Sequence, residues 1–118
     1  LNKKYNCKIS HMKLYVLVPC FNEIKTINKI INNLVKVKKD IRIILIDDGS
    51  NDGTIEFIYK NIKKKIYRFI DLKKNSGKGH AIKKAKKFIK KDSFVIIQDA
   101  DLEYNVKDLI RIFQYQHL

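Results

Sequence analysis

Residues 41–54 read Ile-Arg-Ile-Ile-Leu-Ile-Asp-Asp-Gly-Ser-Asn-Asp-Gly-Thr. The run from Ile41 to Ile46 is rich in β-branched side chains, which is typical of a parallel strand buried on both faces. Acidic residues, glycines and a serine follow at once and predict a turn-rich loop. The stretch therefore predicts a buried strand that ends in two carboxylates, Asp47 and Asp48.

The rest of the chain repeats this alternation of strands and helices. Short apolar runs predict further strands at Leu14 to Val18, where Pro19 is expected to end the strand, at Tyr67 to Leu72 and at Phe94 to Ile97. Apolar residues at helical spacing predict a helix after each strand: Ile24, Ile27, Ile31, Leu34 and Val35; Ile55, Ile58 and Ile62; Ala81, Ile82, Ala85, Phe88 and Ile89; Val106, Leu109, Ile110 and Phe113. This order predicts an α/β fold, with a mostly parallel sheet covered by helices on both faces.

Composition excludes several classes of protein. The chain has 118 residues, enough for one domain or a part of one, and 45% of them are hydrophobic, which argues against intrinsic disorder. No apolar run approaches the roughly 20 residues of a membrane-spanning helix. Two cysteines, Cys7 and Cys20, are too few for a disulfide framework and lack the spacing of a metal site.

The chain is strongly basic. It has 26 basic and 12 acidic residues, a formal net charge of +14, and all but three of the basic residues are lysine. Two interpretations remain open: solvated lysine faces that reflect compositional drift, or an anionic partner such as a membrane surface or nucleic acid. A basic nucleic-acid-binding domain stays an alternative, but aromatic residues are not interleaved with the lysines, so we expect no nucleic-acid partner.

Acidic residues follow three of the predicted strands. In open α/β sheets, ligands bind beyond the carboxyl ends of the strands, and Glu23, Asp47, Asp48, Asp99 and Asp101 are expected there. Positions two apart on an extended chain face the same way, so Asp99 and Asp101 would repel each other unless a cation joins them. Hard carboxylate oxygens suit Mg²⁺ or Mn²⁺. The alternative is a loop acid followed by a helix cap.

Asp47 and Asp48 are adjacent, so their side chains point to opposite sides. One carboxylate could meet a ligand in the crevice, for example a ribose hydroxyl or a base N–H, while the other caps the following turn. A helix N-terminus rich in Asp and Ser is the alternative. Lys78 and His80, at the start of a predicted helix, could approach a diphosphate or could simply be solvated.

Four segments together resemble family 2 glycosyltransferases. They are Val18-Pro19-Cys20-Phe21-Asn22-Glu23, Ile46-Asp47-Asp48-Gly49-Ser50-Asn51-Asp52-Gly53-Thr54, Asn75-Ser76-Gly77-Lys78-Gly79-His80-Ala81 and Gln98-Asp99-Ala100-Asp101-Leu102-Glu103-Tyr104. Within that family, the last segment and Gly77-Lys78-Gly79 are most similar to polyprenyl-phosphate glycosyltransferases such as the dolichol-phosphate mannose synthases.

The resemblance implies the Rossmann-like nucleotide-binding half of a GT-A fold. It implies an inverting, metal-dependent transfer of a sugar from a nucleotide sugar, of the UDP-glucose or GDP-mannose class, to a polyprenyl or dolichyl phosphate. A saccharide acceptor is the alternative. It also implies a location at the cytoplasmic face of a membrane, with peripheral contact to anionic lipid.

The resemblance also assigns roles to individual residues. Pro19, Phe21 and Glu23 would line the nucleotide pocket with Ile46 beside them, and Asp48 would contact the base or ribose. Asp99 and Asp101 would be the catalytic residues that hold Mg²⁺ or Mn²⁺ on the diphosphate, and Ala100 would lie near the sugar nucleotide.

The resemblance also sets the expected domain organisation. Residues 1–11 show no periodicity and are expected to be unstructured or extraneous, while 12–118 would form the nucleotide-sugar-binding part. The family's catalytic domain is longer, so we expect this sequence to stop before the acceptor-side half and the piece alone could lack activity.

Overall fold

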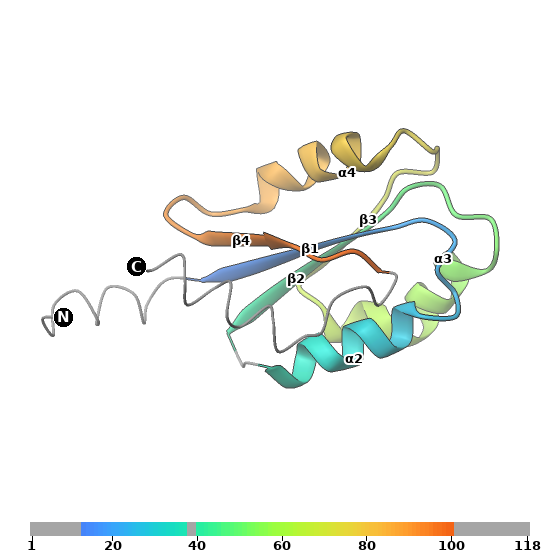
Figure 1. Ribbon diagram of the computed structural model, residues 1–118, viewed down its shortest axis with the longest axis horizontal. Helices are drawn as coiled ribbons and strands as arrows, with labels where there is room; N and C mark the ends of the chain where they lie inside the picture. The colour runs from blue at the N-terminus through green and yellow to red at the C-terminus, as the bar shows by residue number, and fades with distance from the viewer. Residues whose placement is uncertain (1–12, 38–39, 101–118) are drawn as a thin grey trace, which may run out of the picture.

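A parallel sheet forms the centre of the computed structural model, which describes residues 13–37 and 40–100 (Figure 1). The strands are β1 (Leu14–Cys20), β2 (Ile41–Asp47), β3 (Arg68–Asp71) and β4 (Phe94–Ile97), in the order β3-β2-β1-β4. β1 pairs with β2 along its whole length, from Leu14 opposite Ile41 to Cys20 opposite Asp47. The predicted α/β class with a parallel sheet is therefore confirmed.

Helices cover both faces of this sheet. α2 (Ile27–Val37) and α3 (Thr54–Phe57), which continues as η1 (Ile58–Ile62) and η2 (Lys63–Lys65), lie on one face. α4 (Lys78–Ala85), followed by η3 (Lys86–Phe88), lies on the other (Figure 1). No helix in the described part of the chain is both long and apolar enough to cross a membrane.

The core has two halves because side chains alternate along each strand. Val16, Val18 and Leu45 pack toward α2 and η1. Tyr15, Leu17, Ile44 and Ile46 pack toward Ala81 and Ala85 of α4. Both faces of β1 and β2 are thus buried, as their unbroken apolar runs predict.

The structure corrects two details of the predicted elements. Pro19 does not end β1: it pairs with Ile46 of β2. The backbone of Leu17 faces β4, and its carbonyl accepts a hydrogen bond from the Gln98 nitrogen. The backbone of Pro19, two residues later, faces the same side, but the pairing of β1 with β4 has already ended at Leu17. The N–H that proline lacks therefore removes no hydrogen bond from the sheet.

The buried stripe of α2 also differs from the prediction. Ile24 precedes the helix and Val35 is 45% exposed, whereas Ile30 is buried. The helix starts three residues after Ile24, and its buried stripe is Ile27, Ile30, Ile31 and Leu34, which includes Ile30 in place of Val35. The helix predicted around Val106 and residues 1–11 lie outside the described part of the chain.

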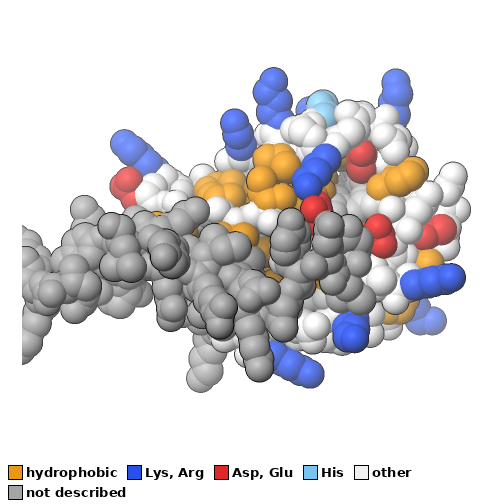
Figure 2. All heavy atoms as spheres, viewed as in Figure 1, with side chains coloured by type: hydrophobic (Ala, Val, Ile, Leu, Met, Phe, Trp, Pro, Cys, Tyr) orange, Lys and Arg blue, Asp and Glu red, His pale blue; other side chains and the backbone are white. Residues whose placement is uncertain are grey.

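Lysine and arginine side chains project at several places from the described surface that Figure 2 shows. On α4 and η3, Lys83, Lys84, Lys86 and Lys87 are exposed while Ala81 and Ala85 face the sheet. The apolar stripe of this basic helix is therefore used for packing within the domain.

Gly49, two residues after the end of β2, is expected to tolerate no side chain. Its φ is +81°, and a Cβ there would lie 2.6 Å from the backbone nitrogen of Asn75 and 2.8 Å from the carbonyl carbon of Lys74. Gly49→Ala should lower the free energy of unfolding by at least about 2 kcal/mol, because backbone strain and a backbone clash add. Urea denaturation measures this loss.

Two other glycines are matched controls for that substitution. Gly53 also has a positive φ, +96°, but open space around it, so Gly53→Ala should cost only the strain, about 1–2 kcal/mol. Gly79 lies in α4 with open space, so Gly79→Ala should be neutral or stabilising by up to about 1 kcal/mol. Equal losses for Gly49→Ala and Gly53→Ala would contradict the close approach of the two loops.

Candidate functional site

A cleft of about 200 Å³ lies at the carboxyl ends of the strands. The strand order places β2 on one side of β1 and β4 on the other, so the sheet reverses its winding between β1 and β4. Ligands of open α/β sheets bind at such a switch point. The lining residues come from the ends of β1, β2 and β4 and from the β3–α4 segment: Pro19, Cys20, Phe21, Asp48, Asn75, Lys78 and Asp99.

Asp47 shapes the loop that follows β2. Its side chain is fully buried, and its two carboxylate oxygens accept hydrogen bonds from the Ser50 backbone nitrogen at 2.8 Å and the Ser50 hydroxyl at 2.6 Å. The Cys20 thiol donates to Asp47 at 3.4 Å. Burial, together with this carboxylate, raises the pKa of the Cys20 thiol, so the thiol stays neutral. Asp47 is thus the acid of the pair that caps the turn.

Polar contacts join the β1–α2 loop to the loop after β2. The Asn22 backbone nitrogen donates to the Ser50 hydroxyl at 2.8 Å, and the Asn22 side-chain oxygen accepts from the Asn51 backbone nitrogen at 2.8 Å.

Asp52 adds a further contact between the same two loops. Burial raises the pKa of Asp52, but hydrogen bonds from Thr54 and from the Ile24 backbone nitrogen outweigh this effect, so the pKa lies below its ordinary value. Two loops on the cleft's wall are therefore held together.

Asp48 faces the cleft from the end of β2. Its side chain is only 6% exposed, and its carboxylate oxygens accept hydrogen bonds from the backbone nitrogens of Ser76 at 2.7 Å and Gly77 at 2.9 Å. Asp48 thus lines the cleft where the sequence predicts a ligand contact, and it also holds the segment that precedes α4.

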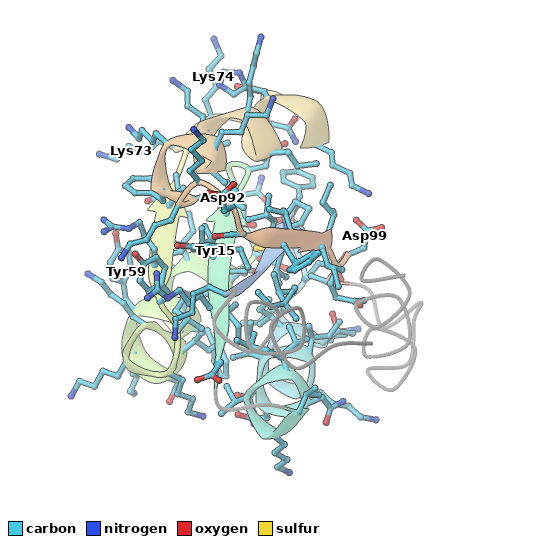
Figure 3. All side chains as sticks on the ribbon, turned by 90° about the vertical axis from the view of Figure 1, so that its left-hand side faces the viewer. Tyr15, Tyr59, Lys73, Lys74, Asp92 and Asp99 are labelled. Atoms are coloured by element: carbon cyan, nitrogen blue, oxygen red, sulfur yellow. The ribbon has the colours of Figure 1, made fainter. Side chains whose placement is uncertain are left out.

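Asp99 stands at the opposite wall, after β4, and projects away from the sheet (Figure 3). Its carboxylate lies 2.6 Å from the Lys78 ammonium group, and the Asp99 side chain is 30% exposed. This half-buried carboxylate has the hard oxygens that Mg²⁺ or Mn²⁺ prefers, so Asp99 fits a divalent cation that takes its other ligands from a bound phosphate. No group of three or more His, Cys, Asp or Glu side chains within residues 13–37 and 40–100 could hold a metal by itself.

The remaining predicted site residues lie in different surroundings. Pro19 and Phe21 line the cleft, and Phe21 is 43% exposed. Glu23 does not line the cleft: its carboxylate accepts a hydrogen bond from Thr26 at 3.0 Å. Ile46 is fully buried toward α4, so its side chain cannot touch a ligand in the cleft.

Ala100 and Asp101 complete the predicted set. Ala100 is buried, and its carbonyl accepts a hydrogen bond from the Thr26 hydroxyl at 2.6 Å. Asp101 lies outside the described residues. Two lining residues, Cys20 and Asn75, were not predicted as site residues. Their positions in the sequence could have indicated them. Cys20 stands between the predicted site residues Pro19 and Phe21, and Asn75 lies in the same segment as Lys78.

Comparison with known proteins gives the family. The family model described as glycosyl transferase family 2 matches residues 15–117. The chain is 36% identical to poly-beta-1,6-N-acetyl-D-glucosamine synthase of Staphylococcus aureus over 103 residues, which cover 86% of this chain and 25% of the synthase. It therefore spans about a quarter of the length of that curated relative.

Solved structures show the same fold. S. aureus TarS in complex with UDP-GlcNAc has a TM-score of 0.64 and 28% identity, and the match covers 90% of this chain and 32% of that one. The mannosyltransferase PcManGT from Pyrobaculum calidifontis, in complex with GDP-Man and Mn²⁺, has a TM-score of 0.71 and 21% identity, covering 86% and 31%. At 21% identity, the similarity to PcManGT shows only a shared fold. These matches confirm the predicted GT-A, Rossmann-like architecture, and the chain belongs to glycosyl transferase family 2.

Proposed function

We propose that this chain carries the nucleotide-sugar-binding part of an inverting, metal-dependent glycosyltransferase. The observation that carries the proposal is the cleft at the switch point, with an exposed aromatic ring, Phe21, on one wall and an accessible carboxylate, Asp99, on the other. A nucleotide needs an apolar surface for its base and cationic or metal-bound surroundings for its diphosphate. The cleft holds Phe21 for the base and, for the diphosphate, the Lys78 ammonium group and a carboxylate that would hold a cation.

The ligand would lie across the carboxyl ends of the strands. The base and ribose would lie against Pro19 and Phe21, near Asp48. The diphosphate would lie toward Lys78 and the positive end of the α4 dipole. Asp99 and Asp101 would hold Mg²⁺ or Mn²⁺, which when bound would neutralise the charge that develops on the leaving nucleoside diphosphate.

A UDP-sugar is the donor that the relatives favour. The S. aureus synthase is named for poly-N-acetyl-D-glucosamine, and TarS is described in complex with UDP-GlcNAc. The fold neighbour from P. calidifontis is described with GDP-Man, so a GDP-sugar is the alternative. We therefore propose UDP as the nucleotide, with N-acetylglucosamine or a related hexose as the sugar.

Two acceptor classes remain as proposals. A saccharide acceptor is supported by the name of the S. aureus synthase. A polyprenyl or dolichyl phosphate is supported by the residue pattern Gln98-Asp99-Ala100-Asp101 and by the lysine-rich segment 72–91, which contains nine lysines and no acidic residue. That segment could contact anionic lipid at the cytoplasmic face of a membrane.

Calorimetric titration of UDP and GDP into the chain tests the donor site. We expect UDP to bind in the presence of Mn²⁺. EDTA and Asp99→Asn should each weaken binding by at least about tenfold, because EDTA removes the cation and the substitution removes a carboxylate that would hold it. Asp101→Asn should do the same. Asp92→Asn is the matched control: Asp92 precedes β4, far from its carboxyl end, and its φ of 62° suits Asn equally well. Metal-independent binding, or an Asp99→Asn variant that binds like the parent, would contradict the proposal.

A transfer assay separates the two acceptor classes. Radiolabelled UDP-GlcNAc is incubated with Mn²⁺ and the natural full-length protein, together with a β-1,6-linked glucosamine oligosaccharide or with dolichyl phosphate in vesicles. We expect label in the oligosaccharide and not in the lipid, because the relative named for its product is named for a polysaccharide. Label in the lipid alone would reverse this assignment and favour the polyprenyl-phosphate class.

A further inference from the structure

Side chains hold the chain directly after β4, where the sheet no longer does. The pairing of β1 with β4 ends at Leu17, whose carbonyl accepts one further backbone hydrogen bond, from the Gln98 nitrogen at 2.9 Å. Beyond it, the Gln98 side-chain amide donates to the Asp99 carbonyl at 3.1 Å. The Thr26 hydroxyl donates to the Ala100 carbonyl at 2.6 Å. Side chains thus take the place of a neighbouring strand at the position of Asp99.

Thr26 lies 74 residues away from Ala100 along the chain, at the start of α2. Its backbone N–H donates to the Glu23 carbonyl at 3.1 Å, and its own carbonyl accepts from the Ile30 nitrogen at 3.1 Å. The next residue, Ile27, is fully buried in the core. The Thr26 hydroxyl therefore projects from a backbone that the first turn of α2 holds in place.

Two acceptors lie within reach of the Thr26 hydroxyl. The Ala100 carbonyl is 2.6 Å away and a carboxylate oxygen of Glu23 is 3.0 Å away. A hydroxyl has only one proton to donate, and hydrogen bonds between two oxygens are most often about 2.7–2.8 Å long. The Ala100 carbonyl, at the shorter distance, takes the larger share of this proton.

Ala100 is held at its side chain as well as at its carbonyl. It is 3% exposed and packs in the half of the core that faces α2. The neighbouring Asp99 side chain reaches the other way, to the Lys78 ammonium group of α4 at 2.6 Å. Fixing Ala100 on the α2 side therefore also fixes the direction in which Asp99 presents its carboxylate to the cleft.

We propose that Thr26 is a positioning residue for the cation site, acting through the Ala100 carbonyl. Its hydroxyl holds the peptide that follows Asp99, so that the Asp99 carboxylate stands ready for Mg²⁺ or Mn²⁺. Mg²⁺ requires oxygen ligands at about 2.0–2.1 Å in near-octahedral geometry, so even a small rotation of this segment weakens the site. This inference rests on the proposed nucleotide site and deepens it.

The test removes the hydroxyl and measures Mn²⁺ and UDP separately. Thr26→Val keeps the branched shape of the side chain and loses only the donor. In the natural full-length protein saturated with UDP, electron paramagnetic resonance of free Mn²⁺ should show about tenfold weaker Mn²⁺ binding. Binding of UDP in EDTA should be unchanged, because the walls that would hold the base are untouched. Thr26→Ser, which keeps the hydroxyl, should bind Mn²⁺ like the parent.

The controls separate this inference from the proposed function. Ser93→Ala removes a hydroxyl just before the other end of β4 and should change neither affinity. A Thr26→Val variant that binds Mn²⁺ like the parent, or an equal loss in Thr26→Ser, would overturn the inference and leave the proposed function intact. A parent protein that shows no Mn²⁺-dependent UDP binding would overturn both.

Nuclear magnetic resonance of the Ala100 carbonyl carbon tests the contact without any ligand. Labelling alanine carbonyls together with aspartate nitrogens selects the peptide between Ala100 and Asp101, because no other alanine of these 118 residues precedes an aspartate. Loss of the hydrogen bond should move this signal upfield in Thr26→Val, and Thr26→Ser should restore it. A signal that does not move would overturn the proposal. If Thr26→Val does not fold, Thr26→Ala, which also lacks the hydroxyl and favours a helix more, carries the same expectations.

Discussion

The candidate site depends on the hydrogen bonds from the Ser76 and Gly77 backbone to the Asp48 carboxylate. They connect the end of a central strand to the start of a helix on one face of the sheet. Because the acceptor is charged and almost fully buried, the contact is stronger than an ordinary loop hydrogen bond. Lys78 follows directly, and through it the contact reaches Asp99 at the edge of the sheet. One carboxylate thus links the end of β2 to the segment that contributes Asn75 and Lys78 to the cleft.

The adjacent acids after β2 have separate tasks because neighbouring side chains point to opposite sides. Asp47 turns inward, binds Ser50 and, through Ser50, holds the Asn22 backbone of the first loop. Asp48 turns toward the cleft and binds the third loop. The Asp-Asp pair at the end of β2 therefore fastens the loops after β1 and β3 to the same strand. Both loops contribute lining residues, so the cleft is built around the end of β2.

Sequence patterns predicted the strands and the fold class well, because these follow from local periodicity, and they placed Asp48 and Asp99 after the ends of strands. The side of β2 to which Ile46 points was not predictable, since a strand buried on both faces has no polar side to mark its orientation. The extension of β1 through Pro19 depends on β4 being shorter than its neighbour, which no local pattern records. The start of α2 was placed too early because Ile24 is apolar but lies in the preceding turn.

The contacts that make the site were also beyond sequence reasoning. The pairs Asp48 with Gly77 and Lys78 with Asp99 join residues that are distant along the chain, and they depend on how loops fold rather than on residue type. The family resemblance suggested a ligand contact for Asp48 and could not indicate that its oxygens bind backbone. The sequence did indicate that carboxylates follow the ends of several strands. The parallel topology brings these strand ends to one edge of the sheet.

Paramagnetic broadening of amide signals by Mn²⁺ with UDP tests most directly the central claim that this cleft binds a metal–nucleotide complex. With substoichiometric Mn²⁺ and UDP, the signals of Gly77, Lys78 and Asp99 should broaden first, and that of Phe21 should shift with UDP. The signal of Asp92, before the other end of β4, should stay sharp. Broadening around Asp92 or along the lysines of η3, with Asp99 unaffected, would contradict the assignment of the cleft.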